Sequence, residues 1–287
     1  MFKEIAVDPN AVAKSFRDLT YVVEKFGIPE GRLIARFPKQ WRRMAYQAAE
    51  VQHRGTVELS RIQERLRRMN ESAFIARHRP GDGCEADWLG SAVTEHGRLP
   101  FDGIIASVQR PEPFVVDLEQ LDGNHPLLEP SRQKHVARVA ADMADACGPL
   151  LTHARHVKLV DPHFDAGAPR FRNPFEAFLG KLPPGAQIDV FRGEGVDLAT
   201  AVDRMDRVLL HRDMRGCRVR LFLRPQESMH NRFVLSELGG VSFGIGLDED
   251  FGGDRPDDLV MLLEQGPWQV EWNRHTGDNP IRVWGDE

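Results

Sequence analysis

The stretch His230-Asn231-Arg232, together with Gly244-Ile245-Gly246-Leu247-Asp248 further along the chain, decides the fold of the C-terminal part. Arg232–Leu235 and Val241–Ile245 are apolar segments, and Glu237-Leu238-Gly239-Gly240 lies between them. Two such segments joined by a glycine-containing turn predict a β-hairpin. The hairpin therefore carries the two motifs on either side of its turn.

The spacing of this stretch resembles the signature of the phospholipase D superfamily, which reads H-x-K, four residues, D, six residues, G-S-x-N. The residues in the places of the signature's His, Lys, Asp and Gly are His230, Arg232, Glu237 and Gly244. Ile245 and Leu247 stand where the signature has Ser and Asn. The register is kept, and several chemical groups are exchanged.

One branch of the superfamily is more similar. The phospholipase D-like domain at the C-terminus of proteins with a microtubule-interacting-and-trafficking (MIT) domain carries H-x-R, a glycine turn, an apolar strand and G-x-G-L-D. The chain matches this pattern from His230-x-Arg232 to Gly244-x-Gly246-Leu247-Asp248. The resemblance covers about residues 130–275, and nothing similar to an MIT three-helix domain precedes it. It implies an α/β fold, a phospholipase D-like sandwich with a mixed sheet.

Helices and strands alternate from residue 131 onward, which favours an α/β sandwich on its own. Ser131 is expected to cap a long helix, because apolar residues recur at helical spacing as far as Leu150. The expected elements are a helix over 131–150, a strand over 157–160, a helix over 174–182, a strand over 187–191, a helix over 197–212, a strand over 218–223, the hairpin, and final strands over 258–263 and 268–272.

Residues 1–125 are predicted to form a mainly helical α+β domain. Three apolar stripes predict its helices, beginning near Pro9, Pro38 and Leu59. Short strands are expected at 72–76 and 103–106, a helix over 88–93, and a turn at Pro80–Gly83. Leu121–Pro126 is predicted to connect this domain to a second one over 130–287.

Composition places the chain among ordinary globular proteins. It has 41% hydrophobic and 28% charged residues, and no apolar run long enough to span a bilayer. Its start does not resemble a signal peptide. Three cysteines without metal spacing predict neither a disulfide framework nor a zinc site. We expect a cytoplasmic protein without a metal or other cofactor.

Charge is distributed unevenly. Residues 38–80 hold ten Lys or Arg against four Glu, a net charge of +6. Residues 247–287 hold eleven acids against three Arg, a net charge of −8. Such opposed poles can steer a polyanion to one end of a molecule. The alternative, solvated helix faces with internal charge balance, remains open.

The motif supplies groups suited to phosphodiester chemistry without a metal. Such cleavage needs a nucleophile, an acid for the leaving oxygen, and cations for the phosphate oxygens. The resemblance implies that His230 acts as nucleophile or acid and base, Arg232 holds the phosphate, and Glu237 stands for the signature's Asp. His156-Val157-Lys158 matches H-x-K by letters, but we interpret it as a chance match. A second His would then come from another subunit, which predicts a homodimer, or be missing, in which case the site could bind phosphate without efficient turnover.

Further candidates lie at the end of a predicted strand. Asp161, His163 and Asp165 follow the strand over 157–160, where open α/β sheets bind ligands. The remaining candidates for phosphate or substrate contacts are Arg170, Arg172, Gly244 and Gly246. Packing of the loop by Phe164 is the alternative explanation. Asp248-Glu249-Asp250 is interpreted as a solvated acidic loop rather than a metal site.

Two functions follow from these residues. The first is a phospholipase D-like phosphodiesterase, in particular a metal-independent nuclease in defence against foreign DNA, with the basic stretch 38–80 holding nucleic acid. Partner proteins of one operon would fit that role. The second is a catalytically degenerate module that binds the phosphates of anionic lipid or nucleic acid. Loss of the Ser and Asn equivalents favours binding, and retention of His230 favours chemistry.

Overall fold

A computed structural model describes residues 1–77, 79, 86–129, 131–277 and 279–285. The chain is a mixed α/β protein with two sheets. It divides into two compact units, Phe2–Ser131 and Arg132–Glu287. The boundary between these units follows the predicted connector, Leu121–Pro126, by a few residues.

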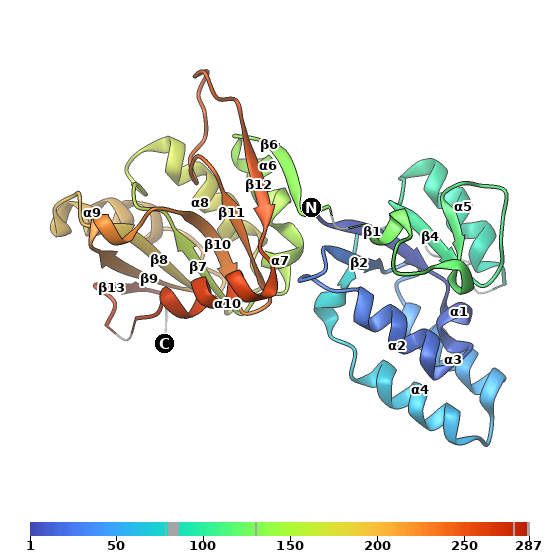
Figure 1. Cartoon of the computed structure of the whole chain (residues 1–287). Coiled ribbons are helices and arrows are strands. Elements are labelled where there is room, and N and C mark those ends of the chain that lie inside the picture. Colours follow the sequence, from blue (N-terminus) through green and yellow to red (C-terminus); the bar gives the residue numbers. More distant parts are fainter. Residues whose placement is uncertain (78, 80–85, 130, 278, 286–287) are drawn as a thin grey trace. The chain divides into compact units, whose positions relative to one another are not determined.

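Within its described residues, the N-terminal unit holds a five-stranded parallel sheet in the order β3-β2-β1-β4-β5 (Figure 1). The strands are β1 Lys3–Val7, β2 Arg32–Ala35, β3 Phe74–Ile75, β4 Gly103–Ala106 and β5 Val115–Asp117. The α-helices are α1 Pro9–Ala13, α2 Phe16–Lys25, α3 Trp41–His53, α4 Val57–Arg67 and α5 Trp88–Arg98. The strand order on either side of β1 is that of a doubly wound fold.

This sheet corrects the prediction of a mainly helical α+β domain. Its strands are short and buried on both faces, as is usual for parallel strands covered by helices. Their sequences therefore show no alternation of apolar and polar residues. The helix predicted from Pro9 is two helices, because Ser15 ends the first turn and accepts a hydrogen bond from Asp18 N as the N-cap of α2. The turn predicted at Pro80–Gly83 lies outside the described residues.

The described residues of the C-terminal unit form an eight-stranded mixed sheet in the order β13-β9-β8-β7-β10-β11-β12-β6. Its strands are β6 Gln133–Ala137, β7 His156–Val160, β8 Gln187–Gly193, β9 Arg218–Arg224, β10 Arg232–Ser236, β11 Gly239–Phe243, β12 Asp257–Leu262 and β13 Arg282–Trp284. β7, β8 and β9 run parallel, and the other neighbours pair antiparallel.

Helices cover both faces of this sheet. They are α6 Ala140–Ala146, α7 Gly148–Thr152, α8 Pro169–Lys181, α9 Leu198–Leu209 and α10 Gln265–Arg274. Figure 1 shows α10 on one face, with α6, α7 and α8 on the other. Two residues of α10, Trp268 and Trp272, pack against an apolar cluster on the sheet. The cluster consists of Val160, Phe191, Phe222, Met229, Phe233 and Leu235.

Two predictions for this unit were wrong. The segment 131–150 is not one helix but strand β6 followed by α6 and α7, because β6 pairs with β12 at the sheet edge. The final strand expected over 268–272 is part of helix α10. The predicted hairpin is confirmed, with Phe233 opposite Ser242 and a turn between Ser236 and Gly239.

The strand order reverses its direction beside β7. From β7 the chain passes to β8 and β9 in one direction, and then returns to add β10 on the other side of β7. Open α/β sheets bind ligands at the carboxyl ends of their strands where the order reverses in this way. The residues that follow β7 and precede β10 therefore occupy the expected edge.

Candidate functional site

Three adjacent strands carry Arg192, Asp161 and Arg232 in one row at this edge. Val160 pairs with Phe191 of β8 and with Phe233 of β10. The next residue, Asp161, therefore lies between Arg192 on one side and Arg232 on the other. Because side chains alternate along a strand, all three belong to the sheet face opposite α10. The sheet thus brings two guanidinium groups beside one carboxylate.

Asp161 is almost fully buried, with 2% of its surface exposed. Its carboxylate accepts hydrogen bonds from His163 N at 2.8 Å and from Leu247 N at 2.9 Å. Burial raises the pKa of Asp161, whereas these two amides and the charge of Arg232 act in the opposite direction. Asp161 therefore joins the loop after β7 to the loop after β11.

Arg192 and Arg232 carry more positive charge than Asp161 offsets. Arg192 is 4% exposed, and its Nε donates to the carbonyl of Gly193 at 3.2 Å. Burial lowers the pKa of Arg192, and the charges of Asp165 and Asp161 oppose that shift. Within the described residues, no carboxylate lies within hydrogen-bonding distance of either guanidinium. Arg192 is thus enclosed and Arg232 is partly exposed at this edge, and neither guanidinium is hydrogen-bonded to a carboxylate of the described residues.

Arg232 also fixes the backbone of His230. Its Nη1 donates to the carbonyl of His230 at 3.0 Å, and its buried Nε has no hydrogen-bond partner. The side chain of His230 is exposed, and the described residues make no hydrogen bond to its imidazole. His163 is exposed as well, after the turn that Asp161 stabilises. Both histidines are accessible from solvent at this edge.

The glycine motif after β11 is held by carboxylates of the chain itself. Gly244 N and Ile245 N donate to the two oxygens of Asp258, at 3.1 and 2.9 Å. Asp258 is buried, and Leu247 N donates to Asp161. These amides therefore shape the loop and are occupied. Gly246 is buried in the same loop, where an added Cβ would lie 3.6 Å from Asp161 Oδ2.

The acidic run after this motif serves mainly to hold the loop. Asp248 bonds Arg138 at 2.8 Å, and Arg170 Nε lies 3.9 Å from its other oxygen. Glu249 and Asp250 accept hydrogen bonds from Ala140 N and Asn173 Nδ2, and from Gly253 N and Arg255 N, respectively. In the described part of the chain, no three His, Cys, Asp or Glu side chains come together as metal ligands.

The structure separates Arg172 from Arg170. Residues two apart on a helix point to different sides, so Arg170 approaches Asp248 while Arg172 lines a cavity of about 390 Å³ between α8 and α9. Arg204 lines the same cavity and forms an ion pair with Asp165 at 2.5 Å. Asp165 is therefore committed to Arg204, and Arg172 is not part of the row at the sheet edge.

Glu237 lies at the opposite end of β10 from Arg232. Its carboxylate accepts hydrogen bonds from Arg155 N at 2.6 Å and His156 N at 3.1 Å, at the start of β7. The structure does not bring Glu237 together with His230. His156 instead bonds the buried Asp189 at 2.8 Å, on the face covered by α10.

Sequence reasoning missed Arg192. It follows the apolar run of β8, as Asp161 follows that of β7. Parallel neighbours end at one edge of the sheet, so a charged residue at the end of the second strand is expected beside the first. That signal was available in Phe191-Arg192-Gly193.

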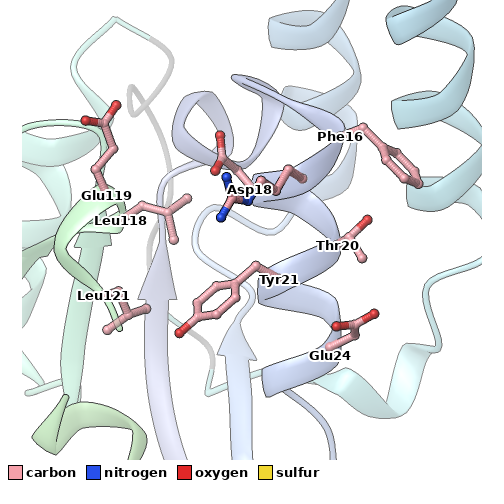
Figure 2. A pocket seen from close by; sticks show the side chains of 9 residues that line it. Phe16, Asp18, Thr20, Tyr21, Glu24, Leu118, Glu119 and Leu121 are labelled. Carbon is pink, nitrogen blue, oxygen red and sulfur yellow. The ribbon is translucent and has the colours of Figure 1, made fainter. Parts of the chain in front are cut away.

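A different cavity, of about 660 Å³, lies along α2 in the N-terminal unit (Figure 2). Figure 2 shows Tyr21 beside Leu118 and Leu121, and its buried hydroxyl has no hydrogen-bond partner. The charged lining residues are Arg17, Asp18, Glu24 and Glu119. Three carboxylates against one guanidinium disfavour an anion, so this cavity does not fit a phosphate.

Comparisons with known proteins give no family. No family model matches the chain, and no curated protein matches it. Among solved structures, the chain is similar to TrmBL2, an archaeal chromatin protein with a novel mode of DNA binding, at 10% sequence identity and a TM-score of 0.28. The match covers 52% of each chain, about half, and a likeness this low carries no argument. None of the described helices is long and apolar enough to cross a membrane.

Proposed function

We propose that the C-terminal unit is a phospholipase D-like module that binds a phosphodiester of nucleic acid at the edge formed by Arg192, Asp161 and Arg232. The observation that carries this proposal is two guanidiniums beside one carboxylate, with Arg232 Nε unpartnered. Arginine is suited to bidentate contacts with phosphate oxygens and stays charged at any working pH.

Binding without cleavage fits the surroundings of this row better than turnover does. An imidazole that transfers protons is usually oriented by a third group. His230 has no such partner among the described residues, and Glu237 lies at the far end of β10. The loop amides that would otherwise face a phosphate are bonded to Asp258 and Asp161.

The binding test uses a labelled single-stranded DNA, a labelled RNA of the same sequence, and liposomes with and without anionic lipid. We expect Arg192→Gln to weaken binding of the oligonucleotides by roughly tenfold, the usual contribution of a charge-assisted hydrogen bond. The variant's melting curve controls for folding. Equal affinity of variant and wild type contradicts the proposal, and binding to anionic liposomes alone replaces nucleic acid by lipid as the ligand.

A metal-independent phosphodiesterase is the second candidate, favoured by one observation. The imidazole of His230 is exposed beside Arg232, and phosphate binding alone does not require it. A twofold-related copy would supply the second histidine of a homodimeric nuclease. To test for this activity, wild type and His230→Ala are incubated with labelled DNA and RNA in EDTA. Cleavage by the wild type alone supports the enzyme, and cleavage by both or by neither excludes it.

A further inference from the structure

The N-terminal unit contains a second group of cations that the site above does not use. Arg36 follows β2 directly, and its amide donates to the carbonyl of Ile75 at the end of β3, at 2.8 Å. Arg36, Lys39 and Arg42 line a cavity of about 80 Å³ with Trp41, Glu71 and Phe74. This cavity lies at the carboxyl ends of parallel strands, where doubly wound folds bind ligands.

The two guanidiniums in this cavity are fixed on an aromatic ring. The guanidinium carbon of Arg36 lies 5.6 Å from the centroid of Phe74, and that of Arg42 lies 5.2 Å from it. Arg42 also donates to the carbonyl of Met69 at 3.0 Å. These contacts pre-orient both side chains, which lowers the entropy cost of binding a ligand between them.

Glu71 occupies the place of an anion in this cluster. Its carboxylate bonds both Arg36 and Arg42, the latter at 2.8 Å, and its side chain is 56% exposed. One carboxylate against three cations leaves a net charge of +2 in the cavity. An exposed ion pair of this kind contributes little to stability and is easily exchanged.

The start of α3 adds to this positive potential. Gln40 provides no side-chain cap, and the first turn contains no acidic residue. It contains Arg42 instead, although cations are unfavourable at the positive end of a helix. A local arrangement that works against helix stability in this way is expected at a functional site. A bound anion would relieve it.

We propose that Arg36, Lys39 and Arg42 bind a phosphate monoester, the 5′-phosphate of a nucleotide or of a nucleic-acid end. With Glu71 displaced, Arg36, Lys39 and Arg42 carry three positive charges, and the dianion of a monoester offsets more of them than the single charge of a diester does. The cavity is small, about 80 Å³, and open to solvent, so a base or sugar attached to the phosphate would extend out of it. The phosphate then replaces the Glu71 carboxylate as the partner of Arg36 and Arg42.

The test uses the full chain carrying Arg232→Gln, which separates this site from the one at the C-terminal edge. The probes are inorganic phosphate, adenosine 5′-monophosphate, and a single-stranded DNA decamer with a 5′-phosphate or a 5′-hydroxyl. We expect the 5′-phosphate to tighten decamer binding by roughly tenfold. The double variant Arg36→Gln, Arg42→Gln should abolish this difference, and Arg61→Gln, an exposed residue of α4, should keep it.

A further variant, Glu71→Gln, tests the phosphate site even if the double variant fails to fold. Glu71→Gln removes the competing carboxylate and keeps the shape of the side chain. We expect it to tighten binding of inorganic phosphate and of the phosphorylated decamer by roughly threefold or more. Equal binding of the two decamers by the parent chain overturns the proposal. Unchanged or weaker phosphate binding by Glu71→Gln does so as well.

Discussion

Asp161, which directly follows β7, lies beside Arg232 of β10, although 70 residues separate them in the chain. Asp161 holds the loop after β11 through Leu247 N, and Arg232 holds the backbone of His230. The charge of Arg232 also opposes the rise in the pKa of Asp161 that burial causes. Asp161 and Arg232 therefore hold the loops at this edge, and Arg232 also supplies the positive charge proposed to bind a phosphate.

Replacing Asp161 by alanine should destabilise the chain. The change leaves the amides of His163 and Leu247 without an acceptor. It also removes one of the two carboxylates, Asp161 and Asp165, whose charges act on the buried Arg192. Together these losses should cost about 3 kcal/mol of unfolding free energy. Asp161→Asn keeps one acceptor and should cost less. Urea unfolding of the wild type and the two variants measures their order of stability. An alanine variant as stable as the wild type would contradict the structural role of Asp161.

Glu237→Ala should reduce stability without reducing oligonucleotide binding. The carboxylate caps the amides of Arg155 and His156, so its removal should cost about 1–2 kcal/mol. Because Glu237 is at the opposite end of β10 from Arg232, affinity for labelled single-stranded DNA should change by less than about twofold. Fluorescence anisotropy measures that affinity. A roughly tenfold loss of affinity in Glu237→Ala would show that Glu237 belongs to the binding site.

Stability should rise with pH above neutrality because of Lys158. Burial lowers the pKa of this lysine to about 8, with the Asp189 charge opposing the shift, and its ammonium donates to Trp272 O at 2.7 Å. Between pH 8 and the ordinary value of 10.5 the unfolded chain binds more protons, so folding is favoured as pH increases. The gain approaches roughly 3 kcal/mol over that window.

Lys158→Met provides the comparison, because methionine fills similar space and does not titrate. Urea unfolding at pH 7.5 and pH 10 should show the wild type gaining stability relative to this variant. Other titrating groups are common to both proteins and cancel in the difference. Parallel pH profiles of the two proteins would show that Lys158 keeps its ordinary pKa in the folded chain.

Much of the C-terminal sheet was predictable from sequence, for a physical reason. The expected segments 157–160, 187–191 and 218–223 lie within β7, β8 and β9, because apolar residues dominate each segment or alternate with polar residues in it. β6 was not predictable in this way. It is an edge strand with three exposed residues, and only its pairing with β12, more than a hundred residues away, makes it a strand.

The N-terminal sheet was predicted only in part. The strands expected at 72–76 and 103–106 contain β3 and coincide with β4. β1, β2 and β5 were missed because they are short and show no alternation of apolar and polar residues; all four residues of β2 are buried. β1 begins with charged residues, and its buried Glu4 forms ion pairs with Arg79 at 2.8 Å and with Arg77 at 3.2 Å, both far along the chain. Such long-range pairing leaves no local trace in the sequence.

The candidate site was predictable in part. Asp161 and Arg232 were both expected near a strand end, and the sheet brings them together. Glu237 was assigned from spacing alone, but the five residues of β10 carry it to the other edge. Arg170 and Arg172 are close in sequence and are predicted to act together, whereas helix geometry directs them to different sides of α8.

The most direct test of the phosphate-binding edge compares Arg232→Gln with Arg172→Gln. Each variant removes one guanidinium from the same unit, but only Arg232 belongs to the row with Asp161 and Arg192. Anisotropy of a labelled single-stranded DNA, titrated at several salt concentrations, measures affinity and its salt dependence. We expect Arg232→Gln to bind roughly tenfold more weakly, with a shallower salt dependence, and Arg172→Gln to match the wild type. Equal affinity of all three proteins would contradict the account.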